Sequence, residues 1–431
     1  MKDLPSIEQE SAESIRKFQN DELQKLLRYL MTSSAFYRRK FQKEGLDVSS
    51  IDLDNLIKIS PTSKDDLQQY NWDFLCVPKN RVAEYTSTSG TMGKPVTIAM
   101  TQNDLDRLAY NECLSFKCAG GTSDDVYQLM LTLDRQFMAG IAYYHGIRKL
   151  GASVVRVGPG LPAMQLETIQ RLRPTVLVAV PSFLVKLVEY ATHHGIDLNA
   201  LSVKRAICIG ESIRTPKFTY NILGAKIKEN WNIALFSTYA STEMQTAFTE
   251  CEYEVGGHLR PELLIVELLD EHDQVVATGM PGEITITTLG VEGMPLIRYK
   301  TGDIAIGYNE PCRCGRTTLR LGPVLGRKQQ LIKLKGTTVY PPGIFEILNG
   351  IPCVKDFVVE AYTSDLGTDE IRLYLVGDMN YPDDVAKTVS ASMQSRLRVT
   401  PQINITSQES LDKMHSGGRK VNRFIDSRTT I

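Results

Sequence analysis

Apolar residues near the start of the chain recur at helical spacing. Leu23, Leu26, Leu27 and Leu30 lie three or four positions apart, which predicts one helix over residues 21–41. From residue 125 to about 241, short apolar stretches alternate with amphipathic ones. The apolar stretches predict strands at 126–133, 152–158, 175–181, 204–211 and 233–241, and the amphipathic stretches predict helices at 139–151, 166–174 and 182–195. This alternation with short connections indicates a parallel, doubly wound α/β sheet.

The pattern changes after about residue 251. Residues 263–270, 282–289 and 303–309 form short alternating segments separated by Gly, Pro and Asp, which indicates a smaller β-rich subdomain. The last unit begins with a predicted hairpin at 330–341 and a helix at 342–351. Predicted strands at 354–363 and 370–378 and a helix at 383–399 follow. We therefore predict an N-terminal domain over residues 1–326 and a compact α+β C-terminal domain over 327–431, joined by a hinge at 322–330.

Composition narrows the functional classes. The 431 residues are 42% hydrophobic and 23% charged, which is globular, and the net charge of −1 lacks the basic surplus expected of a nucleic-acid binder. No run of 18 or more apolar residues predicts a membrane span, and the polar N-terminus lacks the apolar core of a signal peptide. Eight Cys are too few for a disulfide scaffold, so a reducing, cytoplasmic environment is expected.

The stretch STSGTMGKPV at residues 87–96 is a candidate phosphate loop. Gly90 and Gly93 permit close approach of the backbone to a ligand. The hydroxyls and the cation that suit a polyphosphate come from Ser87, Thr88, Ser89, Thr91 and Lys94. The spacing is neither a Walker loop nor a dinucleotide fingerprint. By itself, the stretch is equally consistent with an ordinary Gly/Ser turn.

Three further motifs follow in order. The sequence YASTE, from Tyr239 to Glu243, comes after a predicted strand, at the edge where open α/β sheets bind ligands. Residues 298–303, RYKTGD, present Asp303 after a predicted tight turn. Gly326 and Arg327 precede the sequence KLKG in the last unit. With the Gly-rich stretch, these motifs resemble the adenylate-forming superfamily, and the chain is most similar to phenylacetate–coenzyme A ligases over nearly its whole length.

The resemblance implies a fold and an activity. The fold would be a large α/β N-terminal domain with doubly wound sheets and a β-rich subdomain, followed by a small, mobile α+β C-terminal domain. The enzyme would use ATP and Mg²⁺ to adenylate a carboxylic acid, releasing pyrophosphate, and would pass the acyl group to coenzyme A, releasing AMP. An aryl or arylacetic acid is expected. Two alternatives stay open: transfer to an amine, hydroxyl or carrier protein, and a catalytically degenerate nucleotide-binding homologue. A homodimer is expected because dimers are the commonest oligomers.

The resemblance also implies roles for residues of the nucleotide site. The Gly-rich stretch with Lys94 would hold the β- and γ-phosphates. Glu243 would bind Mg²⁺, and Thr242 would contact the α-phosphate. Asp303 would accept hydrogen bonds from the ribose hydroxyls. Adenine would lie against Gly210, Glu211 and Tyr239. Taken alone, Glu243 also fits a solvated carboxylate at a helix start. Asp303 taken alone also fits a carboxylate that stabilises a turn.

The C-terminal motifs and the acyl pocket are assigned by the same resemblance. Arg327 matches the Arg of the pair before the hinge, which would fall on Gln329. Lys420 would be the adenylation lysine, with Arg419 as the alternative register and a solvated tail cation as the alternative interpretation. Phe137, Tyr143 and His145 would line the acyl pocket, although such side chains are as often part of a core.

Two pairs of metal-binding residue types lie in the β-rich region. Cys251 and His258 form the first pair, and Cys312 and Cys314 form the second. Three thiols and one imidazole are the ligand types of a closed, tetrahedral zinc site, so we predict a structural Zn²⁺. The alternative is three free thiols and a surface His. The remaining Cys are expected to be small buried hydrophobes.

Overall fold

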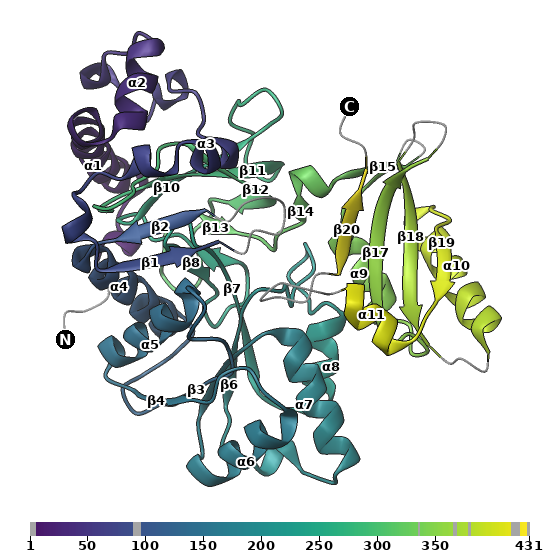
Figure 1. The fold of residues 1–431 in the computed structure, drawn as a ribbon. Coiled ribbons are helices and arrows are strands. Elements are labelled where there is room, and N and C mark those ends of the chain that lie inside the picture. The colour runs from purple at the N-terminus through teal and green to yellow at the C-terminus, as the bar shows by residue number, and fades with distance from the viewer. Residues whose placement is uncertain are drawn as a thin grey trace. The chain divides into compact units, whose positions relative to one another are not determined.

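The computed structural model describes residues 6–88, 96–334, 337–364, 369–377, 381–414 and 423–428. These residues form two compact units (Figure 1). The larger unit holds residues 6–88, 96–301 and 305–324, and the smaller holds residues 302–304 with the described residues from 325 onward. Among the described residues, no helix combines the length and the apolar character that a membrane crossing needs. The roles of 1–326 and 327–431 as an adenylation domain and a mobile domain stay predictions.

One half of the main sheet is parallel, as predicted. Its strands lie in the order β4 (Ser153–Arg156), β3 (Val126–Leu129), β5 (Val176–Ala179), β6 (Arg205–Cys208) and β7 (Ala234–Ser241). Val176 and Val178 pack on one face with α4 (Gln102–Cys118) and α5 (Met138–Leu150). Leu177 and Ala179 pack on the other face with α6 (Pro162–Leu172), α7 (Pro181–His193) and α8 (Ile222–Asn230). Both faces are therefore covered by helices, which confirms the doubly wound architecture.

The other half of the sheet contains the β-rich region. Beyond β7 the order is β8 (Thr246–Thr249), β9 (Gly257–His258), β13 (Arg320–Leu321), β12 (Tyr299–Tyr308), β11 (Pro281–Thr288) and β10 (Leu264–Leu269), with β14 (Gly326–Arg327) paired to β12. A separate hairpin joins β1 (Glu84–Ser87) to β2 (Thr97–Met100). The tight turn predicted for RYKTGD is wrong: residues 299–303 begin β12, although Arg298 and Gly302 have positive φ values of 44° and 80°.

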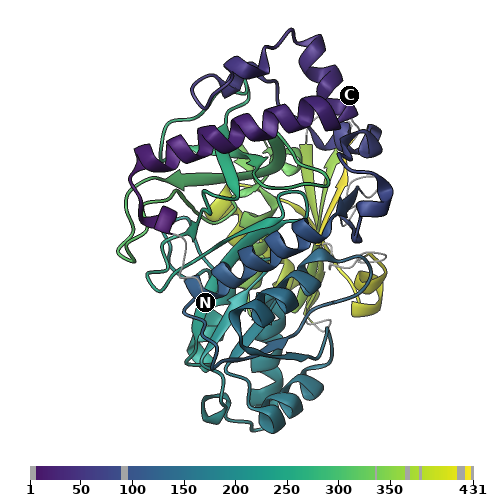
Figure 2. The same ribbon diagram turned by 90° about the vertical axis from the view of Figure 1, so that its left-hand side faces the viewer.

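The N-terminal segment contains two main helices, so the single helix predicted over 21–41 is wrong. α1 (Ala12–Ser33) ends and α2 (Ala35–Lys43) begins at Ser34, whose backbone is extended at φ −98° and ψ 119°. The Ser34 hydroxyl accepts a hydrogen bond from the backbone N–H of Tyr37, which caps α2. The buried leucines of α1 share a core with residues of β10 and β11, and the helix lies across these strands (Figure 2).

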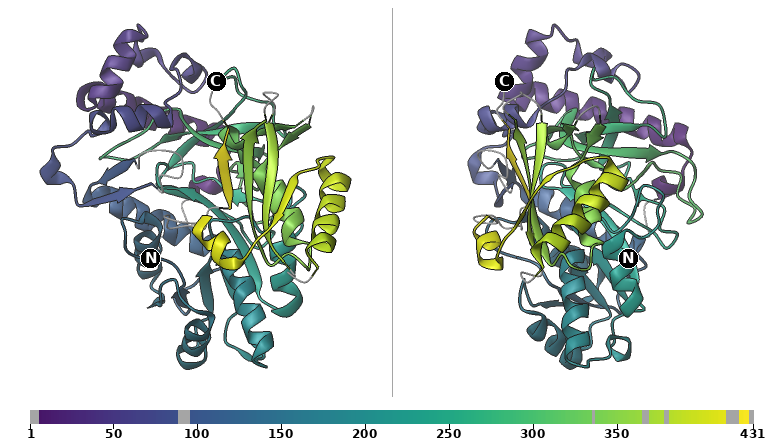
Figure 3. Two further views of the ribbon diagram at one scale, coloured as in Figure 1. Left: turned by 45° about the vertical axis from the view of Figure 1, so that its right-hand side comes forward. Right: turned by 90° about the vertical axis from the view of Figure 1, so that its right-hand side faces the viewer.

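The smaller unit is an α+β module with its own core. A hairpin of β15 (Ile332–Leu334) and β16 (Thr337–Val339) accompanies a four-stranded sheet in the order β19 (Gln402–Ile405), β18 (Asp369–Val376), β17 (Asp356–Thr363) and β20 (Phe424–Ser427). α9 (Pro341–Asn349) and α10 (Pro382–Leu397) bury their apolar faces against this sheet, and α11 (Gln408–Met414) precedes β20 (Figure 3). The predicted hairpin, strands and helices of this module are confirmed.

The remaining described elements are short. They are α3 (Lys64–Gln69) and the 3-10 helices η1 (Ser6–Gln9), η2 (Val48–Ser50), η3 (Leu56–Lys58), η4 (Asn71–Phe74), η5 (Lys79–Arg81), η6 (Leu198–Ala200) and η7 (Lys328–Gln330). Of these, η1 bears on the sites described below, because it carries the buried carboxylate of Glu8.

Candidate functional site

Glu243 lies just past the end of a strand in the middle of the main sheet. β7 ends at Ser241, so Thr242 and Glu243 follow its carboxyl end, and both side chains are half-buried. The hydroxyl of Tyr299 donates a hydrogen bond to Oε1 of Glu243 over 3.3 Å. Tyr299 is buried at the start of β12, within the RYKTGD motif. Folding thus joins two motifs that are 56 positions apart in the sequence.

Tyr239 is also half-buried on β7, and its ring lies 6.1 Å from the ring of Phe248 on β8. The neighbouring strand, β6, leads into Gly210, which has a positive φ of 76°. The carboxylate of Glu211 accepts hydrogen bonds from the backbone N–H of Ser182 at 2.9 Å and from its hydroxyl at 3.0 Å. These bonds satisfy the first turn of α7 and fix the backbone that follows β6.

Asp303 and Arg327 face each other across two paired strands. Asp303 of β12 is in register with Arg327 of β14, and the Nε of Arg327 donates to Oδ1 of Asp303 over 3.2 Å. Asp303 is largely buried, whereas the Arg327 side chain is 47% exposed. An ionised carboxylate in this position can accept further hydrogen bonds, because its two oxygens offer about four acceptor sites.

The described part of the Gly-rich stretch is its base. The backbone N–H of Thr88 donates to the carbonyl of Val96 at 3.0 Å, and the N–H of Val96 donates to the Thr88 hydroxyl at 3.1 Å. Ser87 is buried at the end of β1. The other predicted phosphate-binding residues, Ser89, Gly90, Thr91, Gly93 and Lys94, lie outside the described residues, as do Arg419 and Lys420.

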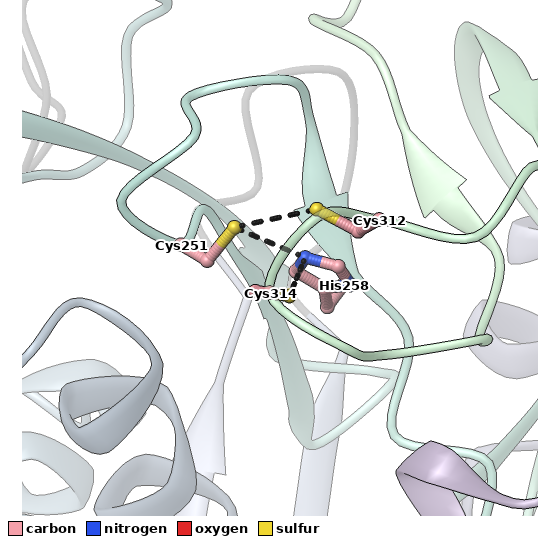
Figure 4. Close-up of side chains that lie close together, drawn as sticks. All are labelled: Cys251, His258, Cys312 and Cys314. Atoms are coloured by element: carbon pink, nitrogen blue, oxygen red, sulfur yellow. Dashed lines mark hydrogen bonds between the residues drawn. The ribbon is translucent and has the colours of Figure 1, made fainter.

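The predicted metal ligands do meet in space (Figure 4). One ligand atom each from Cys251, His258, Cys312 and Cys314 lies within 4.8 Å of all the others. The Cys251 and Cys312 sulfurs are 3.7 Å apart, and His258 Nε2 is 3.4 Å from Cys251 Sγ and 3.5 Å from Cys314 Sγ. Zn–S bonds of about 2.3 Å and Zn–N bonds of about 2.0 Å in a tetrahedron give S···S and S···N separations of about 3.8 and 3.5 Å. The spacing of the side chains therefore fits a tetrahedral ion.

Strand pairing brings the two halves of this group together. His258 of β9 is in register with Thr249 of β8 and with Arg320 of β13, so the segment after β8 and the loop before β13 meet at one place. The loop is closed by bonds from Cys312 N–H to the Arg316 carbonyl and from Gly315 N–H to the Cys312 carbonyl. Gly315 has φ 89°, a conformation that favours glycine.

Charged groups around the cluster are themselves paired. The Arg316 Nη1 donates to Cys314 Sγ over 3.4 Å, and its Nε binds Glu8 at 2.6 Å. Arg260 binds the other oxygen of Glu8 at 2.6 Å. Burial, together with the charges of these arginines and Arg320, lowers the pKa of His258 to about 3. The imidazole is therefore neutral near pH 7, as metal binding requires.

Sequence comparison identifies the family. The family described as AMP-binding enzyme matches residues 18–293. The chain belongs to this family. A phenylacetate-coenzyme A ligase of Thermus thermophilus is 31% identical over 358 residues, covering 81% of this chain and 78% of the relative. A phenylacetate-coenzyme A ligase of Aromatoleum evansii is 24% identical, covering 99% of this chain and 97% of the relative.

Solved structures agree with this AMP-binding enzyme in fold. A crystal structure of 2-hydroxyisobutyryl-CoA ligase in the postadenylation state, in complex with R3-HIB-AMP, superposes with a TM-score of 0.85. The alignment covers 98% of this chain and 92% of that chain at 21% sequence identity. The superposition confirms the fold class, and the family model with the Thermus thermophilus relative confirms the family inferred from the motifs.

The three predicted pocket residues of the AMP-binding enzyme occupy different environments. Tyr143 is buried on α5, and its ring lies 6.0 Å from that of Phe116. Phe137 is half-buried at the start of α5, and His145 is exposed on the same helix. Their role in an acyl pocket stays a prediction.

Two functional candidates, Tyr299 and Arg107, become recognisable only in the folded enzyme. Tyr299 was part of a recognised motif, but its contact with Glu243 depends on how β7 and β12 are placed in one sheet. Arg107 of α4 is buried and binds the segment that follows Glu243. No local pattern marks Arg107, because its partners come from three distant parts of the chain.

Proposed function

We propose that the chain is an ATP-dependent acid–coenzyme A ligase that works through an acyl-adenylate. The observation that carries this proposal is the hydrogen bond from Tyr299 to Glu243, because it unites two nucleotide motifs at the carboxyl end of a central strand. Membership of the AMP-binding family and the two phenylacetate-coenzyme A ligase relatives support it. We further propose an aryl or arylacetic acid as the substrate, which rests on the names of those relatives.

Adenylation joins a carboxylate oxygen of the acid to the α-phosphorus of ATP, and the bond to pyrophosphate breaks. Glu243 is suited to hold Mg²⁺, which binds few carboxylates and several phosphate oxygens. Mg²⁺ would neutralise charge on the phosphates. The hydroxyl of Tyr299 orients the Glu243 carboxylate, and Thr242 would contact the α-phosphate. The Gly-rich stretch with Lys94 would bind the leaving pyrophosphate, as the family motif implies.

The nucleoside would be held by residues from three further segments. Asp303, positioned by Arg327, would accept hydrogen bonds from the ribose hydroxyls. Tyr239 would lie against adenine together with the backbone of Gly210 and Glu211. Glu211 would contribute its backbone because its carboxylate already accepts hydrogen bonds from Ser182. Lys420 would place its ammonium beside the oxygen on which charge develops. In the second step the thiolate of coenzyme A attacks the acyl carbon, and AMP leaves.

A panel of carboxylic acids tests this proposal. Purified protein is incubated with ATP, Mg²⁺ and one acid at a time, and pyrophosphate release is followed with and without coenzyme A. We expect release with an aryl or arylacetic acid, and a new acyl-thioester by mass spectrometry when coenzyme A is added. Pyrophosphate release without any coenzyme A thioester would favour a different acceptor. No release with any acid would overturn the proposal.

We also propose that Cys251, His258, Cys312 and Cys314 hold one structural Zn²⁺. The tetrahedral spacing of the ligand atoms, the neutral imidazole and the hydrogen bond from Arg316 to Cys314 support this assignment. Four protein ligands leave no open coordination position, so the ion would stabilise the junction of β8, β9 and β13 and take no part in the reaction. Elemental analysis of protein purified without chelators should give about one zinc per chain.

A further inference from the structure

The turn after Glu243 is held in a strained conformation. Gln245 has a φ of 49°, in the left-handed region that residues with a side chain rarely adopt. Within the turn, Gln245 N–H and Met244 N–H reach Ser241 at 3.3 Å, which is long for such bonds. The buried side-chain amide of Gln245 has no hydrogen-bond partner among the residues that the structure describes. Local bonds therefore support this turn weakly, and its shape must be imposed from outside.

Arg107 supplies the outside support. Its guanidinium is buried and donates from Nη1 to the carbonyl of Gln245 at 2.9 Å and from Nη2 to the Thr246 hydroxyl at 3.3 Å. The same group binds the carbonyl of Leu263 before β10 and the carbonyl of Leu289 after β11, each at 2.7 Å. A guanidinium is planar and its donors are fixed in direction, so it locks the turn to two strands elsewhere in the sheet.

A second side chain of α4 reaches the same segment. Asn111 lies one helical turn after Arg107, and its Oδ1 accepts from the backbone N–H of Ala247 at 3.2 Å. The four hydrogen bonds of Arg107 go to three carbonyls and one hydroxyl, while the charges of the Asp104 and Glu262 carboxylates favour its protonated form. Burial lowers the pKa of Arg107 to about 10, which still leaves it charged near pH 7.

We infer that Arg107 is a positioning residue for the Mg²⁺ carboxylate of Glu243. Arg107 fixes the backbone on one side of Glu243, and Tyr299 fixes the carboxylate itself. Arg107 does not touch substrate; it acts through the turn. This inference rests on the proposed function, because it assigns a purpose to the geometry of Glu243.

The experiment compares two half-reactions in the full-length enzyme. Arg107→Met removes all four donated bonds, and Arg107→Lys keeps a single ammonium in the same place. Adenylation is measured as pyrophosphate release over a range of Mg²⁺ concentrations, and thioester formation is measured from a supplied acyl-adenylate. We expect Arg107→Met to raise the Mg²⁺ concentration for half-maximal adenylation about 10-fold, with a smaller rise for Arg107→Lys and little change in thioester formation.

Arg205→Met is the matched control. Arg205 also donates to backbone carbonyls in the larger unit, those of Ala119 and Gly120, and within the described part of the chain none of its hydrogen bonds reaches the turn after Glu243. It should leave the Mg²⁺ dependence unchanged. Equal losses in both half-reactions for Arg107→Met, or the same shift in the control, would show that Arg107 is merely structural.

Hydrogen exchange separates this inference from the proposed function. Amide protection of residues 241–247 should fall in Arg107→Met and not in Arg205→Met, whether or not an acid substrate has been found. Unchanged protection in that segment would overturn the positioning role. If the wild-type protein activates no acid but residues 241–247 still lose protection in Arg107→Met, the proposed function is overturned. The contact between Arg107 and the turn after Glu243 would then still stand.

Discussion

The hydroxyl of Tyr299 donates a hydrogen bond to the carboxylate of Glu243 over 3.3 Å. The two residues belong to β12 and to the end of β7, which are separated in the sheet by β8, β9 and β13. A buried phenol is a rigid donor, so the contact sets the direction of the carboxylate before any ligand binds. This orientation is the basis of the first prediction.

Tyr299→Phe removes the donor and keeps the ring. We expect the rate of adenylation to fall about 10-fold and the Mg²⁺ requirement to rise, because a group that orients a metal ligand typically contributes that much. Tyr127→Phe is the control, since Tyr127 is equally buried but lies in the core beside Phe116. An unchanged Mg²⁺ dependence in Tyr299→Phe would contradict the role given to this bond.

Lys420→Ala should separate the two half-reactions. Loss of the ammonium should slow pyrophosphate release by about 10²-fold or more, while thioester formation from supplied acyl-adenylate stays close to wild type. Arg419→Ala tests the register of the motif and should be much less affected. If Arg419→Ala carries the larger loss, the adenylation cation is Arg419; if both half-reactions fall together, neither assignment holds.

Cys312→Ser should remove most of the bound zinc. A structural Zn²⁺ contributes folding energy directly, so we expect this variant to contain much less zinc than wild type and to have a lower Tm. Cys353→Ser is the matched control, because Cys353 is a half-buried free cysteine in the smaller unit. Wild-type protein without zinc, or a Cys312→Ser variant that keeps it, would rule out the site.

The stability of the protein should depend on pH through Glu112. This carboxyl is fully buried on α4, and burial raises its pKa to about 8 against opposing contributions from Asn111 and Arg260. The folded state therefore keeps the proton that the unfolded chain loses near pH 4.5, so this group lowers the free energy of unfolding as pH rises from about 4.5 to 8. Glu112→Gln removes that loss: its Tm should match wild type near pH 4 and exceed it by a few degrees at pH 8. A Tm difference independent of pH would contradict this assignment.

The sequence predicted the parallel half of the fold well, because buried strands and amphipathic helices leave different periodicities. It failed where periodicity carries no information. The apolar spacing of α1 continues into α2, so the break at Ser34 was invisible until its extended backbone was seen. The RYKTGD segment has the composition of a turn, yet from Tyr299 onward pairing within the sheet makes it a strand.

The candidate site shows the same division. Cys251, His258, Cys312 and Cys314 could be proposed as ligands from their chemistry, but only the pairing of β9 with β8 and β13 brings them together. Arg107 could not be proposed at all, since an isolated Arg on a helix is usually solvated. Its positioning role is inferred from its hydrogen bonds to three carbonyls that come from distant segments of the chain.

Transfer of an oxygen isotope tests the central claim most directly. The acid that supports pyrophosphate release is prepared with ¹⁸O in its carboxylate and incubated with ATP, Mg²⁺, coenzyme A and the enzyme, and the products are weighed by mass spectrometry. An acyl-adenylate mechanism predicts one ¹⁸O atom in AMP, because the carboxylate oxygen bonded to the α-phosphorus leaves with it, together with an acyl-coenzyme A thioester. Formation of ADP, or AMP free of ¹⁸O, would contradict the account.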